Sequence, residues 1–382
     1  MRGTVSVNNL NLSQGEFPEI ERKFLFIGVG GNPDNLGKTL SLGNASDLDG
    51  LLGDADSPLK TNLAAARLNA GDNWFAWALP VAADDDNADL LAAFDEAMAT
   101  AFRGTSPEAV VVLRTAQTAA EISAWHDKLM ELRGATGRQM FAILAVPGCL
   151  QTQTWADYEA ATTALVAPLA ANRVMAVPQL HGNNVGVIAG RLCDRSVGVA
   201  DTPMRVETGP LLGLGLGEEP VDADGRLLDE STLMALDAAR LSVPQHYADY
   251  PGTYWADGNL LETPAGDFQV VEYLRPVLKA CRAVRILAIG RIGNKNFNDT
   301  PDSMAWHKHH FARPLREMSK TATVEVGGQK LPLVGDIMPP GAGSVVIQWV
   351  SMTRVNLVLV VKPYRCPKQI VTSIALDLSG EL

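Results

Sequence analysis

Residues 24–29 read Phe24-Leu25-Phe26-Ile27-Gly28-Val29, an apolar run that ends in a glycine-rich loop. A short apolar run bounded by turn residues is typical of a strand buried on both faces of a sheet. Beyond it, predicted strands alternate with predicted helices of ten to fifteen residues. The strands are 39–42, 74–81, 109–113, 139–146 and 173–180, and the helices include 58–70, 88–102, 118–133 and 155–169. This alternation predicts an α/β domain over residues 23–208 with a mostly parallel sheet.

The glycine loop after the first strand invites comparison with a phosphate-binding loop. It reads Gly28-Val29-Gly30-Gly31-Asn32-Pro33-Asp34-Asn35-Leu36-Gly37-Lys38-Thr39. A phosphate loop needs four residues between its first glycine and Gly-Lys-Thr, but that spacing places Asn32 at the glycine position. Pro33 removes one backbone N–H, and Thr39 opens a predicted strand instead of a helix. We therefore favour a hairpin turn, with a phosphate- or nucleotide-handling α/β enzyme as the alternative.

The second half of the chain differs in character from the first. Residues 209–226 are rich in Gly and Pro and are predicted to be a connector. Helices predicted at 229–241, 270–289 and 301–321 are followed by strands predicted at 344–350 and 355–361. Pro276 is expected to interrupt the second of these helices. Helices followed by strands predict a smaller α+β domain over residues 227–365, in which the two strands form a hairpin.

Both ends of the chain lie outside these two domains. Residues 1–22 carry a few spaced apolar residues, among them Val5 and Val7, that cannot bury a face alone. Residues 366–382 contain a clearer strand pattern with a period of two. The residues on one side of it are Ile370, Thr372, Ile374, Leu376 and Leu378. Such a terminal strand either forms an edge of the chain's own sheet or pairs with the exposed edge of a neighbouring molecule.

The composition excludes several classes of function. The 382 residues include 32 Lys and Arg against 43 Asp and Glu, which gives a net charge of −11, and 47% of them are hydrophobic. We expect no nucleic-acid partner, because such binding relies on clustered basic residues. The sequence contains no run of about 18 apolar residues and does not begin with a signal peptide. We therefore expect that the protein is synthesised in the cytoplasm and does not insert into a membrane.

No set of residues suggests catalysis. The cysteines are dozens of residues apart, so they predict neither a zinc site nor a disulfide framework. They are Cys149, Cys193, Cys281 and Cys366. The Gly-x-Ser-x-Gly motif of a serine nucleophile does not occur. We therefore predict no catalytic residue, no cofactor and no metal ion.

The predicted helix at 301–321 carries an unusual density of basic residues. They are His307, Lys308, His309, His310, Arg313, Arg316 and Lys320. His307 and His310 could share a helical face as metal ligands, but a third ligand at helical spacing is missing and the neighbouring cations would repel a metal. This helix is interpreted either as a surface for an acidic partner or as a solvated face.

Short motifs in the first half occur in a recognisable order. A strand ending in Phe26-Ile27-Gly28 precedes Thr39-Leu40-Ser41-Leu42 and then Asp47-Leu48-Asp49-Gly50-Leu51-Leu52-Gly53. Further on, Val177-Pro178 precedes Val187-Ile188-Ala189-Gly190-Arg191. Together these motifs resemble the contractile tail sheath proteins of bacteriophages and related injection machines, which carry a Pro…Val-Ala-Gly segment at the corresponding place.

The second half is similar to the same family. Gly252-Thr253-Tyr254-Trp255 and the residues to Leu261 look like its aromatic strand pair, and an Arg-containing helix begins at Leu274-Arg275-Pro276. The usual aromatic-Gly-Ala-Arg-Thr stretch is replaced by Trp255-Ala256-Asp257-Gly258-Asn259. The chain therefore resembles a divergent branch of the family.

The resemblance implies a structural subunit without enzymatic activity. Its copies would polymerise helically around a tail tube and contract to drive the tube through the host cell envelope. Residues 23–208 would form an outer domain and residues 227–365 an inner one. Expected partners are further copies of the chain, the tail tube protein, and the baseplate and tail terminator proteins. The expected location is the virion tail, assembled in the host cytoplasm, and another lattice-forming tail or secretion-system component is the nearest alternative.

The resemblance also implies roles for individual residues. Terminal arms of sheath proteins donate strands to adjacent subunits, and the donor residues here would be Val5, Val7, Ile370, Ile374, Leu376 and Leu378. The receiving hairpin would contain Val346, Gln348, Val350, Val355, Leu357 and Leu359. The basic helix, with His307, Lys308, Arg313, Arg316 and Lys320, would face the tube.

Overall fold

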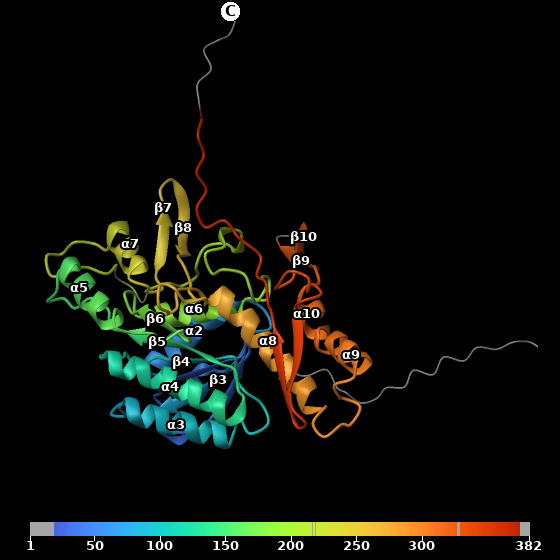
Figure 1. The fold of residues 1–382 in the computed structure, drawn as a ribbon. Coiled ribbons are helices and arrows are strands. Elements are labelled where there is room, and N and C mark those ends of the chain that lie inside the picture. Colours follow the sequence, from blue (N-terminus) through green and yellow to red (C-terminus); the bar gives the residue numbers. More distant parts are fainter. Residues whose placement is uncertain (1–18, 216, 218, 327–328, 375–382) are drawn as a thin grey trace, which may run out of the picture.

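The computed structural model describes residues 19–374 apart from residues 216, 218, 327 and 328. A six-stranded sheet with the order β2-β3-β1-β4-β5-β6 forms its largest unit (Figure 1). The strands are β1 (Phe24–Val29), β2 (Leu40–Gly43), β3 (Phe75–Val81), β4 (Ala109–Val112), β5 (Phe141–Val146) and β6 (Val174–Pro178). Only β2 is antiparallel to its neighbour in this sheet. The prediction of a mainly parallel α/β sheet is confirmed.

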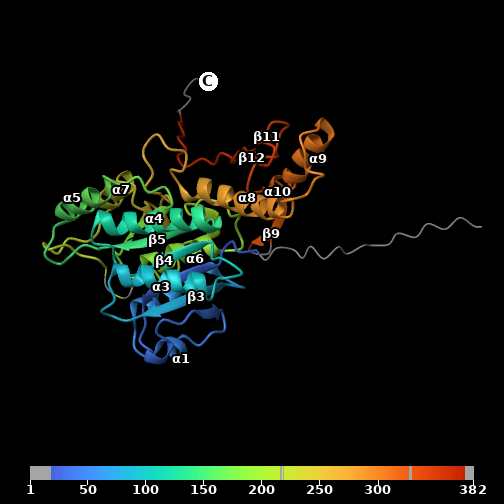
Figure 2. The same ribbon diagram turned by 60° about the horizontal axis from the view of Figure 1, so that its bottom comes forward.

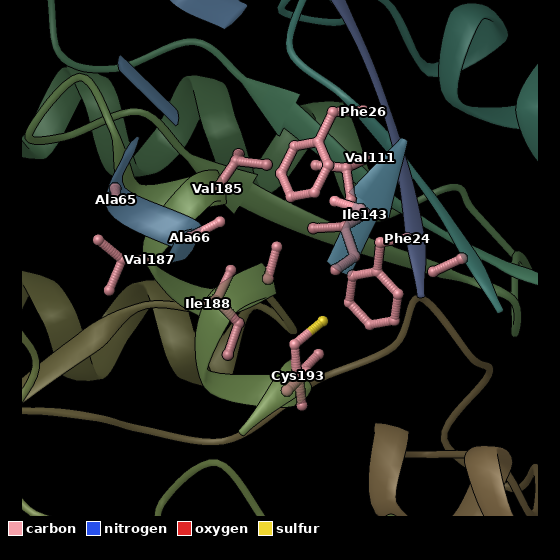
Figure 3. Packing of buried hydrophobic residues seen from close by; sticks show 14 of the residues in the cluster. Phe24, Phe26, Ala65, Ala66, Val111, Ile143, Val185, Val187, Ile188 and Cys193 are labelled. Carbon is pink, nitrogen blue, oxygen red and sulfur yellow. The ribbon is translucent and has the colours of Figure 1, made fainter. Parts of the chain in front are cut away.

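Helices cover both faces of this sheet. The helices of this region are α1 (Leu48–Leu52), α2 (Pro58–Ala70), α3 (Asn87–Ala99), α4 (Ala119–Thr136), α5 (Trp155–Val166) and α6 (Asn184–Cys193), with 3₁₀ turns η1 (Pro33–Asn35) and η2 (Val206–Thr208). Side chains alternate along β1, so Phe24 and Phe26 pack with α2 and α6 on one face (Figure 3). Leu25 and Ile27 pack with α3, α4 and α5 on the other face. Both faces are therefore buried, as the apolar run of β1 predicts.

Polar residues determine where several of these helices begin. The side chains of Ser57, Thr118 and Thr154 each accept a hydrogen bond from a backbone N–H in the first turn of α2, α4 and α5. Asp86 does the same for α3 and forms a capping box with Asp89. Such caps satisfy backbone donors that have no partner inside the helix.

The glycine loop does not form the predicted hairpin turn. Strand β2 lies beside β3, on the far side from β1, so the loop crosses the end of β3. Two backbone hydrogen bonds hold the loop against the end of β3: Gly30 N donates to Val81 O (3.2 Å), and Gly37 N donates to Pro80 O (2.8 Å). The turn residues were identified correctly, but the strand that they lead to was paired wrongly.

In its described part, the second half of the chain contains three small hairpins and a set of helices. The strands are β7 (Pro244–Tyr247), β8 (Tyr250–Trp255), β9 (Ala322–Val326), β10 (Gln329–Leu333), β11 (Val345–Ser351) and β12 (Arg354–Leu359). The helices are α7 (Glu230–Ala238), α8 (Val271–Ile289), α9 (Pro301–Phe311) and α10 (Arg313–Met318). Pro276 lies within α8 without interrupting it. It is in the second turn, where the missing N–H leaves only one helical hydrogen bond unmade.

The division between hydrophobic cores does not coincide with the expected connector at 209–226. Leu233, Leu236 and Leu241 pack in the same cluster as α3 and α4, and Leu274 and Leu278 pack with α2 and α6. A separate cluster begins at Ala280 and includes Phe311 and Ile347. We call residues 19–278 the body and residues 279–362 the lobe. Helix α8 belongs to both and runs from the body into the lobe (Figures 1 and 2).

Two asparagine side chains hold the expected connector against the body. Asn69 Nδ2 donates to Leu212 O (2.7 Å), and Leu212 N donates to Asn69 Oδ1 (2.9 Å). Asn183 Nδ2 donates to Gly213 O (2.8 Å), while its Oδ1 accepts from Gly215 N (3.0 Å). Each amide side chain thus donates to and accepts from the backbone of the segment, as a paired strand would. These hydrogen bonds hold the Gly-rich segment on the body.

Candidate assembly surfaces

The segment that enters β1 is fixed by Arg22. Its backbone N donates to Glu108 Oε2 (2.5 Å), and its guanidinium donates to Asp194 O (3.1 Å) and Val197 O (2.6 Å). Glu21 forms an ion pair with Arg282 of the lobe (2.5 Å). Residues 19–22 are therefore held by both body and lobe. The proposed donor residues Val5 and Val7 lie outside the described residues.

The carboxylate that receives Arg22 N belongs to a buried ion pair. Glu108 is fully buried, and Arg275 of α8 binds it with two hydrogen bonds of 2.7 and 3.0 Å. Burial alone would raise the pKa of Glu108, but Arg275, with Arg282 and the Arg22 amide, holds it below its usual range. The pair joins the start of β4 to α8, the helix that connects body and lobe.

The C-terminal arm leaves the body without regular structure. Residues 363–374 contain no helix or strand, and the chain passes the β7–β8 hairpin before it turns away (Figures 1 and 2). Ile370 is 76% exposed and Ile374 is 96% exposed. Leu376 and Leu378 lie outside the described residues. Residues 370–374 therefore do not form an edge strand of the chain's own fold.

The predicted hairpin at 344–361 is present as β11 and β12. Val346 is paired with Val358 and Gln348 with Asn356, and these four side chains point away from the lobe. Val355, Leu357 and Leu359 are partly buried and pack on the lobe core. The six residues named from the sequence therefore belong to two faces. Strand addition uses backbone N–H and C=O groups, so the outer edge of either β11 or β12 could receive an added strand. Within the described residues, neither edge is paired with another strand.

The predicted basic helix is two helices, α9 and α10, which meet at Ala312. Lys308, Arg313 and Lys320 are exposed, and Arg316 is partly exposed. His307 is buried, so its assignment to an exposed tube-facing surface is wrong. Its ring stacks on Phe297 with 4.2 Å between centroids, and its Nδ1 lies 2.8 Å from the Ser303 carbonyl oxygen. Its position four residues before the buried Phe311 places both on the inner face of α9.

The lobe carries a charge opposite to that of the whole chain. Residues 279–320 contain nine Lys and Arg residues but only three Asp and Glu residues. Within the described residues, six of these nine form no ion pair, and the exceptions are Lys279, Arg282 and Lys320. Exposed apolar side chains lie among them: Ile289 is 50%, Ile292 81% and Trp306 54% exposed. The exposure of these three side chains was not predicted, because in a single sequence an exposed apolar residue cannot be distinguished from a core residue.

The glycine loop offers no cradle for phosphate. Gly30, Gly31 and Gly37 donate their backbone hydrogens to carbonyl oxygens of Val81, Leu52 and Pro80. The Lys38 ammonium lies 2.7 Å from the Asp34 carbonyl oxygen. A phosphate loop needs such amides free at the start of a helix, whereas this loop continues into β2. The alternative of a phosphate-handling enzyme has no support in this geometry.

The described residues contain neither a membrane-spanning helix nor a metal-binding cluster. Within that part of the chain, no helix combines the length and apolar character of a membrane span. Nor do three or more His, Cys, Asp or Glu side chains gather there in an arrangement that could hold a metal ion.

Known proteins resemble this chain along its whole length. The family model "DUF2586, N-terminal domain" matches residues 2–259, and "DUF2586, C-terminal domain" matches residues 267–379. A protein of Haemophilus phage HP1 (strain HP1c1), named "Putative tail sheath protein", is 44% identical over 382 residues. The match covers 99% of this chain and 98% of that protein.

Solved structures share the fold at low sequence identity. The sheath complex of an extracellular contractile injection system (PVC) in the contracted state gives a TM-score of 0.61 at 12% identity, with 99% of each chain covered. The contracted helical sheath of the anti-feeding prophage gives 0.58 at 12% identity, with 98% of this chain and 100% of that chain covered. A sheath tail protein from Listeria innocua gives 0.56 at 8% identity, with 90% and 92% covered. The family models and the phage relative show that the chain belongs to the tail sheath proteins of the DUF2586 family.

Proposed function

We propose that copies of this chain polymerise into a helical sheath around a tail tube and contract to drive the tube through the host cell envelope. The observation that carries this proposal is the C-terminal arm, whose described apolar residues Ile370, Val371 and Ile374 are exposed to solvent. The role is structural rather than catalytic. The partners would be further copies, the tail tube protein, and the baseplate and tail terminator proteins, in a virion tail assembled in the host cytoplasm. Structural neighbours from a contracted sheath and from a baseplate of injection systems support this assignment.

In this proposal the arms connect neighbouring subunits by strand addition. An extended segment that joins an exposed sheet edge gains backbone hydrogen bonds, and its alternating side chains set the register. Ile370, Ile374, Leu376 and Leu378 would be donated at one end of the chain, and Val5 and Val7 at the other. The receiving edges would be those of the β11–β12 hairpin, whose inner face is already packed on α9 and α10.

The second part of the proposal concerns the tube. Both views place α9 at the end of the lobe farthest from the sheet (Figures 1 and 2). Lys308, Arg313, Arg316 and Lys320 would face an acidic tube surface there. Exposed ion pairs are worth about 0–1 kcal/mol each. Such contacts would release one at a time when the sheath contracts.

A truncation tests the arm. Deleting residues 369–382 should abolish tubes seen by negative-stain electron microscopy of the purified chain. The urea midpoint of the unassembled protein should stay unchanged, because residues 369–374 make no hydrogen bond or ion pair with other described residues. Normal tubes from the truncated chain would contradict strand donation by this arm.

A further inference from the structure

As far as residue 374, where the described part of the chain ends, the C-terminal arm has a single polar attachment to the body. The last backbone hydrogen bond before the arm joins Met338 N to Lys362 O (2.8 Å). Among residues 363–374, Lys368 alone forms a hydrogen bond or an ion pair with another described residue. Pro363 and Pro367 lie in the same stretch and have no backbone hydrogen to donate. The polar contacts that hold the arm root, residues 363–368, on the body therefore come from one side chain.

Lys368 binds two carboxylates at once. Its Nζ lies 2.7 Å from both oxygens of Asp257 and 2.5 Å from Glu272 Oε1. Asp257 follows β8, and Glu272 lies in the first turn of α8. The side chains of Asp257 and Lys368 are 17% and 26% exposed, while that of Glu272 is only 2% exposed. We call these three residues the arm tether.

The charges of the tether depend on one another. Burial raises the pKa of Glu272, Lys368 lowers it and Asp257 raises it again, so that it remains above its usual range. Burial would lower the pKa of Lys368, but the two carboxylates raise it, so the ammonium stays charged. Arg240 and Asp237 also lie near Asp257, and Cys366 lies near Glu272. Within the described residues, Lys368 is nevertheless the only basic side chain paired with Glu272 or Asp257.

We propose that Lys368 is a positioning residue: through Asp257 and Glu272 it fixes where the C-terminal arm leaves the body. The tether holds the arm root across a groove that is also lined by Val206, Tyr247 and Tyr250. It thereby sets the point from which Ile370 and the following residues extend. The tether itself follows from the contacts of the single chain, and its importance for assembly rests on the proposed function.

Limited proteolysis of the unassembled full-length chain tests the tether directly. Proteinase K removes unattached chain with little sequence preference, and mass spectrometry locates the new C-terminus. We expect trimming of the wild type to stop at or after residue 369. In Lys368→Met, trimming should proceed back towards residue 363. The same end point in both proteins would overturn the proposal.

Three variants control this experiment. Lys362→Met removes an exposed lysine just before the arm that has no ion pair among the described residues, and its trimming should match the wild type. Lys368→Arg keeps the charge and should restore protection. Lys368→Met leaves Glu272 buried without its cation and could fail to fold, so Asp257→Asn/Glu272→Gln provides the second test. That double variant should be trimmed like Lys368→Met, and wild-type protection would refute the tether.

Electron microscopy then separates the tether from the proposed function. Lys368→Met should lose tube formation, whereas Lys362→Met should keep it. If Lys368→Met is trimmed further but still forms normal tubes, Lys368 does not position the arm for assembly. If the chain lacking residues 369–382 also forms normal tubes, strand donation by the arm is the idea that fails.

Discussion

Individual charged residues connect distant parts of this chain. Glu108 and Arg275 are 167 positions apart in sequence, yet they form a buried two-hydrogen-bond pair. The same carboxylate accepts the backbone N–H of Arg22, where the N-terminal segment enters β1. A buried pair of this kind adds little net stability compared with an apolar pair, but losing one partner leaves an unpaired charge in the interior.

Arg275→Met should lower the free energy of unfolding by about 3–5 kcal/mol, because Glu108 would remain buried without its cation. Urea unfolding of the unassembled chain measures this change. The control is Lys320→Met, which breaks the exposed pair of Lys320 (66% exposed) and Glu317 (55% exposed). It should change the free energy of unfolding by less than about 1 kcal/mol. Equal effects of the two substitutions would contradict the buried role of Arg275.

The lowered pKa of Glu108 predicts how stability depends on pH. A carboxylate with a depressed pKa in the folded state stabilises the fold above its unfolded pKa, about 4.3, and loses that contribution as the pH falls further. The difference in unfolding free energy between wild type and Glu108→Gln should therefore shrink when the pH is lowered from 7 to 3. A constant difference would mean that Glu108 does not titrate in this range.

The sequence could indicate residue types but rarely residue partners. A helical period of 3.6 places His307 and Phe311 on one face, but only the packing of Phe297 shows that this face is buried. Lys368 and Asp257 are 111 positions apart, so nothing local in the sequence suggests their contact. The basic character of α9 could be predicted because charge is a property of composition.

At the scale of elements, the crossing of α2 and α6 depends on two glycines. A side chain at Gly186 would meet the backbone of Asn62, and one at Gly190 would meet the backbone of Ala66. Gly186 N also donates to Asn62 Oδ1 (2.7 Å), which is possible only because the two helices approach so closely. All ten residues of α6 are buried between α2 and the sheet.

Gly186→Ala should lower the free energy of unfolding by about 1–3 kcal/mol, because the added methyl group must push α6 away from Asn62. Gly134→Ala is the matched control within α4, where the methyl group meets no atom within 4 Å. That substitution should stabilise the fold by about 0.4–1 kcal/mol, since glycine costs chain entropy in a helix. Thermal unfolding distinguishes the opposite signs. Destabilisation by Gly134→Ala, or none by Gly186→Ala, would contradict the close crossing.

The reason why α6 escaped prediction is physical. It is only ten residues long and contains the two helix-weakening residues Gly186 and Gly190, and Asn183 gives it no side-chain cap. Helices α2, α3 and α4 were predicted because each is longer and begins with a clear side-chain cap. The β11–β12 hairpin was predicted because its two alternating runs are separated by a short turn. The position of β2 beside β3 was not predicted, because tertiary packing decides the order of the strands in a sheet.

At the scale of the whole molecule, charge and structure divide the chain in a similar way. The lobe concentrates basic residues on a chain whose net charge is −11, and its core is separate from the cores of the body. Helix α8 crosses between them and carries Glu272 and Arg275 near its start and Arg282 further along. The roots of both arms are therefore fixed on the helix that also connects the lobe to the body. A displacement of α8 during contraction would move both arm roots.

The basic lobe leads to the last prediction. Reversing three exposed charges, as Lys308→Glu/Arg313→Glu/Lys320→Glu, should prevent sheath assembly around the tail tube, because an acidic tube surface would then face added negative charge. The matched control, Lys38→Glu/Arg103→Glu/Arg133→Glu, changes the net charge equally at exposed positions of the body. Electron micrographs of tails from complemented phage would be scored for sheathed tubes. We expect sheathed tubes for the control alone. The lobe variant should still form sheath polymers that contain no tube, because the arms of the variant are unchanged. Sheathed tubes in both would show that the basic helices do not face the tube.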